Sequence, residues 1–294
     1  MLLFLVLLSL GSPSPTMTDA TRYRAEIEKW RADRVRRLTA EDGWLSVVGL
    51  SWLEEGDNSV GSAPSARVAL PSGRTPARLG TIRLARGSAS FTAAQGVSVT
   101  HGGKPVRMIA LASDADGEPT ILQHGTVSFY AIRRGDRLGI RVKDSAAPAR
   151  REFHGIDGYA TDPKWRVAAR FEPYRPKKSI PIPNILGSVT QEPSPGAVVF
   201  SIGGQEYRLD AVEEEGEEDL FLIFGDRTNG TATYGAGRFL YAPRPGPDGK
   251  TVVDFNKAYN PPCAFTAYAT CPLPPPQNRL SVAVTAGEKR YGEH

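Results

Sequence analysis

Glycine and proline are spread along the whole chain, and this distribution restricts the fold more than any other feature. The 294 residues include 30 glycines and 24 prolines. Glycine supplies the positive φ angles of tight turns, while proline cannot donate to a strand ladder or continue a helix. Many short strands joined by turns are therefore favoured over a helical bundle, and we expect a mainly β protein.

Lysine and arginine alternate with aspartate and glutamate instead of gathering in runs, and the formal net charge is +4. Binding to nucleic acid requires a concentrated basic face, so we expect no nucleic-acid partner. The sequence also lacks a His-Glu-x-x-His zinc motif, a phosphate-binding glycine loop and a dinucleotide fingerprint. We therefore expect no metal site and no cofactor.

A run of apolar residues from Leu2 to Leu10 is followed by Gly, Ser and Pro. The run is too short to span a bilayer but has the length of a signal-peptide core. We expect residues 1–16 to be an export signal and the mature protein to be periplasmic or secreted. The alternative is a cytoplasmic protein that starts at Met17. No other segment is apolar enough to suggest an integral membrane span.

Helical spacing follows this segment. Tyr23, Ile27, Trp30 and Leu38 fall on one stripe, and charged residues cover the other faces. This pattern predicts an amphipathic helix within residues 17–40. Arg34 lies on the same stripe, so its stem should pack while its head reaches solvent or a carboxylate.

From Asp42 the hydrophobic period changes to two, which predicts strands within residues 41–172, the part of the chain in which a resemblance given below implies a β-sandwich. Alternation is clearest in Leu138–Lys143, and Val127–Ile132 precedes it. The intervening Arg134-Gly135-Asp136 turn predicts that these two strands form a hairpin.

Residues 173–294 are expected to form a second β-rich unit with long proline-rich loops. Proline is dense between Pro173 and Pro183, so this stretch is expected to be a surface connection. Alternating or apolar runs after it predict strands at 197–202, 220–224, 238–241, 251–255 and 280–284.

The most distinctive sequence lies in this second unit. It includes Thr233-Tyr234-Gly235-Ala236-Gly237-Arg238, the tract from Asp254 to Phe265, and Cys271-Pro272-Leu273-Pro274-Pro275. With Asp42-Gly43-Trp44-Leu45 in the first half, these segments resemble the bacterial domain-of-unknown-function family 1684 over about residues 23 to 291. The resemblance implies bacterial proteins, some with export segments, that have no agreed activity.

A weaker resemblance links Val60-Gly61-Ser62, Val68-Ala69-Leu70 and the Gly80 region to forkhead-associated β-sandwiches. Those domains have an arginine after the first glycine and a Ser-x-x-His motif soon afterwards. This chain has Ser62 and Pro76-Ala77-Arg78-Leu79 at the corresponding places. The resemblance thus implies the sandwich without the residues that read phosphothreonine.

Polar side chains are concentrated among aromatic residues and prolines in the second unit, so they either pair in a buried network or line a pocket. We expect Arg238 to hold an anionic group and to meet Asp254 or Glu288 at a solvent-accessible site. Asp254 is the candidate acid or base and Cys263 the candidate nucleophile. The candidate ligand-binding residues are Arg238, Tyr234, Asn256, Tyr259, Asn260, Asp226 and Glu288.

The cysteines, Cys263 and Cys271, have seven residues between them, so we expect them to be neighbours in space, either as a disulfide or as thiols.

Three functions fit these observations. The first is an exported protein that binds a small anionic or envelope-derived ligand in its C-terminal half. The second is a hydrolytic or thiol-dependent enzyme that uses Asp254, Arg238 and Cys263. The third is a rigid interaction module without a pocket.

Overall fold

The computed structural model describes residues 18–214 and 216–292. The predicted export segment and the alternative start at Met17 therefore lie outside the described residues. Within these residues, no helix has both the length and the apolar character needed to cross a membrane.

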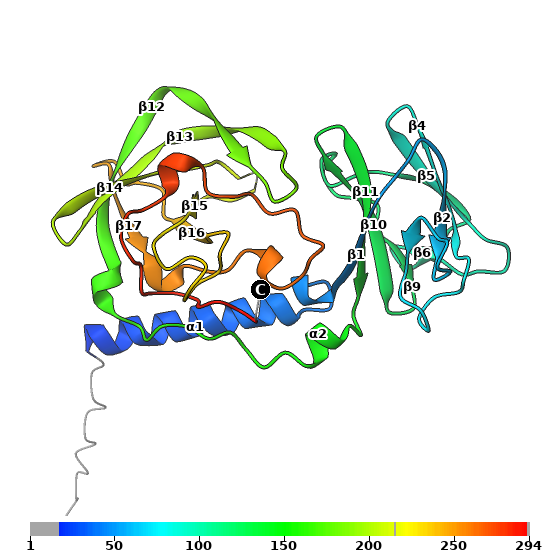
Figure 1. Ribbon diagram of the computed structural model, residues 1–294, viewed down its shortest axis with the longest axis horizontal. Helices are drawn as coiled ribbons and strands as arrows, with labels where there is room; N and C mark the ends of the chain where they lie inside the picture. The colour runs from blue at the N-terminus through cyan, green and yellow to red at the C-terminus, as the bar shows by residue number, and fades with distance from the viewer. Residues whose placement is uncertain (1–17, 215, 293–294) are drawn as a thin grey trace, which may run out of the picture.

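The N-terminal helix is confirmed as α1 (Asp19–Thr39). Its N-cap is Thr18, whose side chain accepts a hydrogen bond from the Thr21 amide. The predicted stripe is the face that packs, because Tyr23, Ile27 and Leu38 are buried. In Figure 1, α1 runs along the base of the C-terminal unit towards the sandwich.

The N-terminal half forms two packed sheets. The first has the strand order β1-β11-β10-β9-β6-β7 and the second the order β3-β2-β4-β5-β8. The short helix η1 (Trp44–Ser46) leads into the strands, which are β1 (Val47–Trp52), β2 (Gly56–Gly61), β3 (Val68–Ala69), β4 (Gly80–Ala85), β5 (Ser88–Ala93), β6 (Thr100–His101), β7 (Lys104–Pro105), β8 (Met108–Leu111), β9 (Leu122–His124), β10 (Val127–Arg134) and β11 (Arg137–Asp144).

One apolar core joins the two sheets of this sandwich. Phe91 on β5 and Phe129 on β10 meet edge to face, with ring centroids 5.6 Å apart. The hairpin is also confirmed, since β10 and β11 pair from Val127↔Asp144 to Arg134↔Arg137. Gly135 adopts a φ of 57° in the turn, a value that glycine reaches without steric cost.

After α2 (Pro148–Arg151) and η2 (Pro163–Trp165), the C-terminal unit begins. Its larger sheet has the order β14-β13-β12-β17, and β15 pairs with β16. These strands are β12 (Arg166–Pro183), β13 (Val189–Ile202), β14 (Gln205–Asp210), β15 (Leu220–Phe224), β16 (Arg238–Ala242) and β17 (Lys250–Asp254). Residue 172 lies within β12, and β12 pairs only with strands of this unit.

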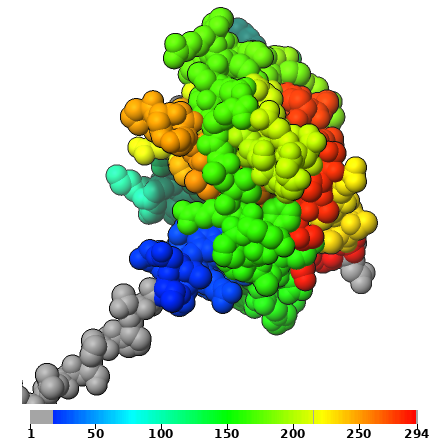
Figure 2. Space-filling view, turned by 90° about the vertical axis from the view of Figure 1, so that its left-hand side faces the viewer, coloured from blue at the N-terminus to red at the C-terminus, as the bar shows by residue number. Residues whose placement is uncertain are grey.

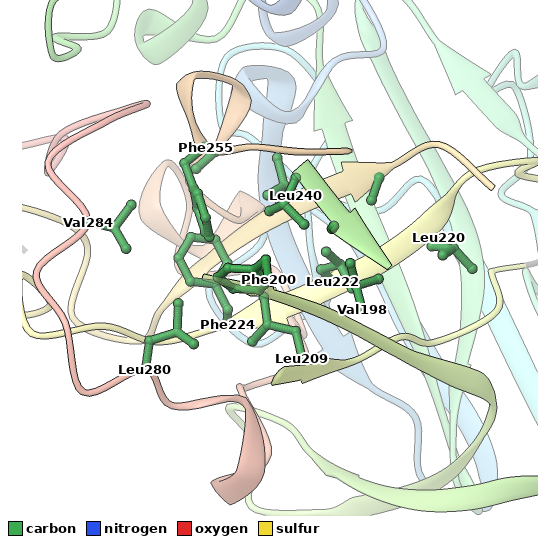
Figure 3. Packing of buried hydrophobic residues seen from close by; sticks show 14 of the residues in the cluster. Val198, Phe200, Leu209, Leu220, Leu222, Phe224, Leu240, Phe255, Leu280 and Val284 are labelled. Atoms are coloured by element: carbon green, nitrogen blue, oxygen red, sulfur yellow. The ribbon is translucent and has the colours of Figure 1, made fainter. Parts of the chain in front are cut away.

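The core of the C-terminal unit is built from both of its sheets and from the loops that follow them (Figure 3). Phe255 lies at its centre, with edge-to-face contacts to Trp165, Phe200 and Phe224. Phe255 begins η3 (Phe255–Lys257), which is followed by η4 (Pro262–Ala264) and η5 (Pro276–Asn278).

The expected surface connection at Pro173–Pro183 is wrong, because this stretch is the second half of β12 and pairs with β13 as far as Pro183↔Val189. The register shifts between Pro173 and Lys178. Beyond Arg170, no strand of the described residues pairs with the other edge of β12, because β17 begins at Lys250, opposite Arg170. Proline is tolerated in a strand with a free edge and at bulges, since its missing N–H is then not required.

The strand predicted at 280–284 is also wrong. The segment bends at residues 281 and 282 and forms no ladder, and its backbone contacts are isolated, for example from the Leu280 amide to the Gly225 carbonyl. The Val284 carbonyl accepts a hydrogen bond from a buried side chain, as described below. Figure 2 shows this late segment in red on the face where α1, in blue, lies against the chain that leads into β12.

Candidate functional site

Arg238 is fully buried, so its expected exposure is wrong, and its carboxylate partner is Asp226 instead of Asp254 or Glu288. Its Nη2 donates to the Asp226 carboxylate at 2.8 Å and to the Val284 carbonyl at 2.9 Å. Its Nη1 donates to the carbonyl groups of Ala286 and Glu288. Burial lowers the pKa of Arg238, and the charge of Asp226 opposes that shift. Arg238 therefore ties together irregular backbone instead of presenting a charge to a ligand.

Asp226 belongs to the same network. Its carboxylate also accepts from the amide and hydroxyl of Thr228 and from the Val284 amide. Both side chains of the Asp226–Arg238 pair have no exposed surface. The pair holds the loop after β15 against the late segment 284–288.

Glu288 joins α1 to the C-terminal unit. One carboxylate oxygen accepts from Arg34 Nε at 3.1 Å, and the other accepts from the Asn260 amide at 2.7 Å. Arg34 also donates to the Asn260 carbonyl. Burial raises the pKa of Glu288, while Arg34 acts in the opposite direction. The expectation that Arg34 would pack its stem and find a carboxylate is confirmed.

A second polar contact holds the start of α1. Tyr23 donates its hydroxyl proton to Asp254 at 2.8 Å, and Asp254 also accepts from the Asn256 amide. The Asn256 side chain donates to the Tyr23 hydroxyl and to the Asp162 carbonyl. Burial and the neighbouring Asp254 raise the pKa of Tyr23. Asp254 is thus engaged in anchoring the helix.

The two cysteines are neighbours, as expected. The Cys263 amide donates to the Cys271 sulfur at 3.1 Å, and the Cys271 amide donates to the Cys263 sulfur at 3.3 Å. Both are free thiols. Tyr234 faces the pair, and burial together with the cysteines raises its pKa to about 12. The proposed trio of Asp254, Arg238 and Cys263 is therefore divided among separate networks.

Two adjoining cavities lie between α1 and the C-terminal unit, with volumes of about 490 and 690 Å³. Arg34, Arg37, Tyr241 and Tyr259 line both of them. We call this continuous depression the α1 groove. Among the predicted site residues, Tyr259 lines both cavities and Asp254 lines the smaller one.

Aromatic side chains form the floor of the α1 groove. Tyr241 and Tyr259 stack with an interplanar angle of 14° and centroids 6.2 Å apart. Phe221 packs against Tyr241 and Phe239 against Tyr259. Burial raises the pKa of both tyrosines, so their hydroxyls are neutral near pH 7. Trp44 adds a further aromatic surface to the larger cavity.

The charged side chains around the α1 groove are mostly paired. Arg34 pairs with Glu288, Lys257 pairs with Glu26, and Glu214 accepts from the Tyr241 hydroxyl. Arg37 is exposed in the last turn of α1 and forms no ion pair or side-chain hydrogen bond with any residue in 18–214 or 216–292. It is therefore a cation available to a ligand at the point where the two cavities meet.

Sequence reasoning missed Arg37 and Tyr241. A signal for Arg37 was present, because Trp30, Arg34 and Arg37 follow the spacing of one helix face. Tyr241 gave no such signal, since only its pairing in β16 and the position of α1 bring it to the groove. Across the described residues, histidine, cysteine, aspartate and glutamate do not gather in groups of three that could hold a metal ion.

Residues 151–289 match the model of a family described as "Protein of unknown function (DUF1684)". The C-terminal unit of the chain belongs to this family. The DUF1684 match covers the C-terminal unit and is narrower than the expected span of 23 to 291. It includes Tyr241 and Tyr259 but not α1. No curated protein matches the chain.

Solved structures give further similarities. An uncharacterized protein from gene locus rrnAC0354 of Haloarcula marismortui is 30% identical, with a TM-score of 0.41, over 50% of this chain and 83% of that chain. A forkhead-associated domain studied for phosphothreonine-dependent interactions is 22% identical, with a TM-score of 0.23, over 32% of this chain and 92% of that chain. Another forkhead-associated domain, that of FhaA, is also 22% identical and covers 32% of this chain.

Proposed function

We propose that the protein binds a small anionic molecule with a flat apolar body in the α1 groove. The observation that supports this most directly is Arg37, an unpaired cation beside a floor of stacked aromatic rings. Stacked aromatic surface accommodates planar groups, and a guanidinium matches carboxylate, sulfonate or phosphate geometry. The cavity volumes of about 490 and 690 Å³ are within the usual range for small-molecule sites.

The charge distribution supports an anion over a cation. The groove tyrosines are neutral, and Glu214 is engaged by Tyr241. Asp42 lines the larger cavity but does not approach Arg37 to ion-pair distance. Glu217 and Asp219 line the smaller cavity, so the acidic side chains are divided between the two cavities. The anionic group of the ligand would therefore lie against Arg37, and its apolar body would extend over the rings into the larger cavity.

The test compares two fluorescent dyes that differ in charge. We expect the anionic dye 1-anilinonaphthalene-8-sulfonate to bind the native protein more tightly than neutral N-phenyl-1-naphthylamine. Arg37→Ala should weaken binding of the sulfonate about tenfold, which corresponds to about 1.4 kcal/mol, and leave binding of the neutral dye unchanged. Fluorescence titration measures both affinities, and a thermal melt of each variant verifies that it is folded.

Arg36→Ala is the matched control, because Arg36 is also exposed on α1 but pairs with Asp33 and does not line the groove. This variant should bind both dyes as the wild type does. Equal affinity of the wild type for the two dyes, or an equal loss in both variants, would exclude an anion site at Arg37.

The proposal also covers the compartment in which binding takes place. The apolar run Leu2–Leu10 predicts export, so we propose that binding takes place in the periplasm or outside the cell. Fractionation followed by N-terminal sequencing should recover a mature chain that begins between Thr16 and Thr21. Recovery from the cytoplasm with Met1 or Met17 at the N-terminus would contradict this.

A further inference from the structure

Arg141 is a buried arginine that pairs with no carboxylate among the residues that the structure describes. It lies on β11 between Ile140 and Val142, whose side chains belong to the sandwich core, so its own side chain points out of the sandwich. The residue is 4% exposed, and its guanidinium stacks over Trp44 at 4.9 Å. Its Nε and Nη2 have no hydrogen-bond partner among residues 18–214 and 216–292.

A buried cation in this state is costly, because desolvation is not offset by an opposite charge. Trp44, on which Arg141 stacks, packs against the cluster that contains Cys271, and Cys263 packs against the same cluster. The charge of Arg141 acts on both cysteines. Tyrosines are other ionisable groups nearby, among them Tyr130, which lies opposite Arg141 on β10, and Tyr234, beside the cysteines. Tyr234 stays protonated near neutral pH. A thiolate on one cysteine would supply the missing negative charge.

The two sulfurs do not differ in their backbone contacts, since each accepts a hydrogen bond from the amide of the other cysteine. Hydrogen bonding from the Cys271 thiol lowers the pKa of Cys263, with Arg141 acting in the same direction. The same interaction, together with burial, raises the pKa of Cys271. Cys263 is also the more exposed of the two, so an incoming reactant meets it first.

We infer that Cys263 and Cys271 form a redox-active dithiol, in which Cys263 is the attacking thiolate, Arg141 is its counterion, and the co-reactant is a low-molecular-mass disulfide.

The reaction balances as a thiol–disulfide exchange. The Cys263 thiolate attacks one sulfur of the disulfide, a mixed disulfide forms, and the other half leaves as a thiolate. Cys271 then gives its proton to solvent or to that leaving thiolate and attacks the Cys263 sulfur. The second half leaves as a thiolate, and the Cys263–Cys271 disulfide is formed. Two electrons pass from the cysteines to the co-reactant, which is reduced to two thiols.

This assignment predicts the effect of charge on the redox equilibrium. Oxidation removes the thiolate and leaves the guanidinium of Arg141 without an anion, so Arg141 stabilises the reduced form. Replacing Arg141 with an uncharged residue should therefore favour the disulfide. A purely structural disulfide with no charge partner would show no such effect.

The first measurement is the rate of alkylation of Cys263 by iodoacetamide as a function of pH, in a Cys271→Ser variant. The midpoint should lie below the ordinary thiol value of about 8.5. Arg141→Met should raise the midpoint by about one pH unit, since a guanidinium close to a thiolate has an effect of that order. Arg137→Met is the matched control, because Arg137 also lies on β11 and stacks on a tryptophan, Trp52, away from the cysteines. It should leave the midpoint unchanged.

The second measurement uses both cysteines. The wild type, Arg141→Met and Arg137→Met are equilibrated in buffers with graded ratios of oxidised to reduced glutathione, and the disulfide is quantified by mass spectrometry. Arg141→Met should become half oxidised at an oxidant ratio about tenfold lower than the wild type requires. A Cys263 midpoint at or above the ordinary thiol value would overturn the inference, even where Arg141→Met fails to fold. So would an intramolecular disulfide that does not form in any buffer.

Discussion

Arg238 and Arg141 are both buried arginines, but the groups that face them differ. The guanidinium of Arg238 donates to the Asp226 carboxylate and to carbonyl groups of the late segment, so its charge is paired and most of its N–H groups are hydrogen-bonded. Arg141 has an aromatic ring and a pair of thiols. An arginine whose charge is paired with a carboxylate stabilises the fold. An arginine without such a partner can act on nearby ionisable groups. The sequence alone does not separate these two cases, because the partner of Arg238 depends on a loop conformation.

The Asp226–Arg238 pair gives a prediction at this scale. Asp226→Asn keeps the shape of the side chain but removes the anion, which leaves a buried guanidinium uncompensated. We expect a loss of about 3–5 kcal/mol in the free energy of unfolding, measured by urea denaturation. Asp248→Asn removes an exposed carboxylate paired with Lys250 and should cost much less, because solvent screens the pair. Similar losses in the two variants would contradict a structural role for Asp226.

At the scale of elements, α1 is held to the C-terminal unit by polar contacts at its two ends. Tyr23 meets Asp254 near the start of the helix, and Arg34 meets Glu288 near its end. The apolar stripe predicted from the sequence supplies the packing between them. The helix, the β10–β11 hairpin and the strands β15 to β17 could be predicted because their periodicity is local. The pairing of the proline-rich part of β12 could not, since it depends on where β17 begins.

Glu288 should make stability depend on pH. Burial raises its pKa in the folded protein, so between the unfolded value of about 4.3 and the higher folded value the native state binds more protons than the unfolded state. The contribution of Glu288 to stability is therefore present below that window and decreases as the pH rises through it. Urea denaturation at a series of pH values measures this slope.

Glu288→Gln should lack the slope that Glu288 contributes, because an amide does not titrate. Glu28→Gln is the matched control, since Glu28 is an exposed carboxylate that pairs with Arg31 on α1. It should retain the wild-type slope. A Glu288→Gln variant with the full wild-type slope would show that another group is responsible.

At the scale of the whole molecule, the α1 groove is assembled from parts that are distant in sequence. Arg37 comes from the first helix, Trp44 from the segment that leads into the sandwich, and Tyr241 and Tyr259 from the C-terminal unit. The sequence alone shows that polar side chains are concentrated in the C-terminal unit. Most of those side chains, however, satisfy irregular loops. The groove itself required the position of α1, which no local pattern encodes.

The attachment of α1 also sets the order in which the protein can become complete during synthesis. Tyr23 and Arg34 leave the ribosome early, but their partners Asp254 and Glu288 follow 231 and 254 positions later. The strands of the sandwich all precede residue 145 and can pair while translation continues. The contacts of α1 with Asp254 and Glu288 cannot form until those residues have emerged. The α1 groove is therefore among the last parts of the protein to form.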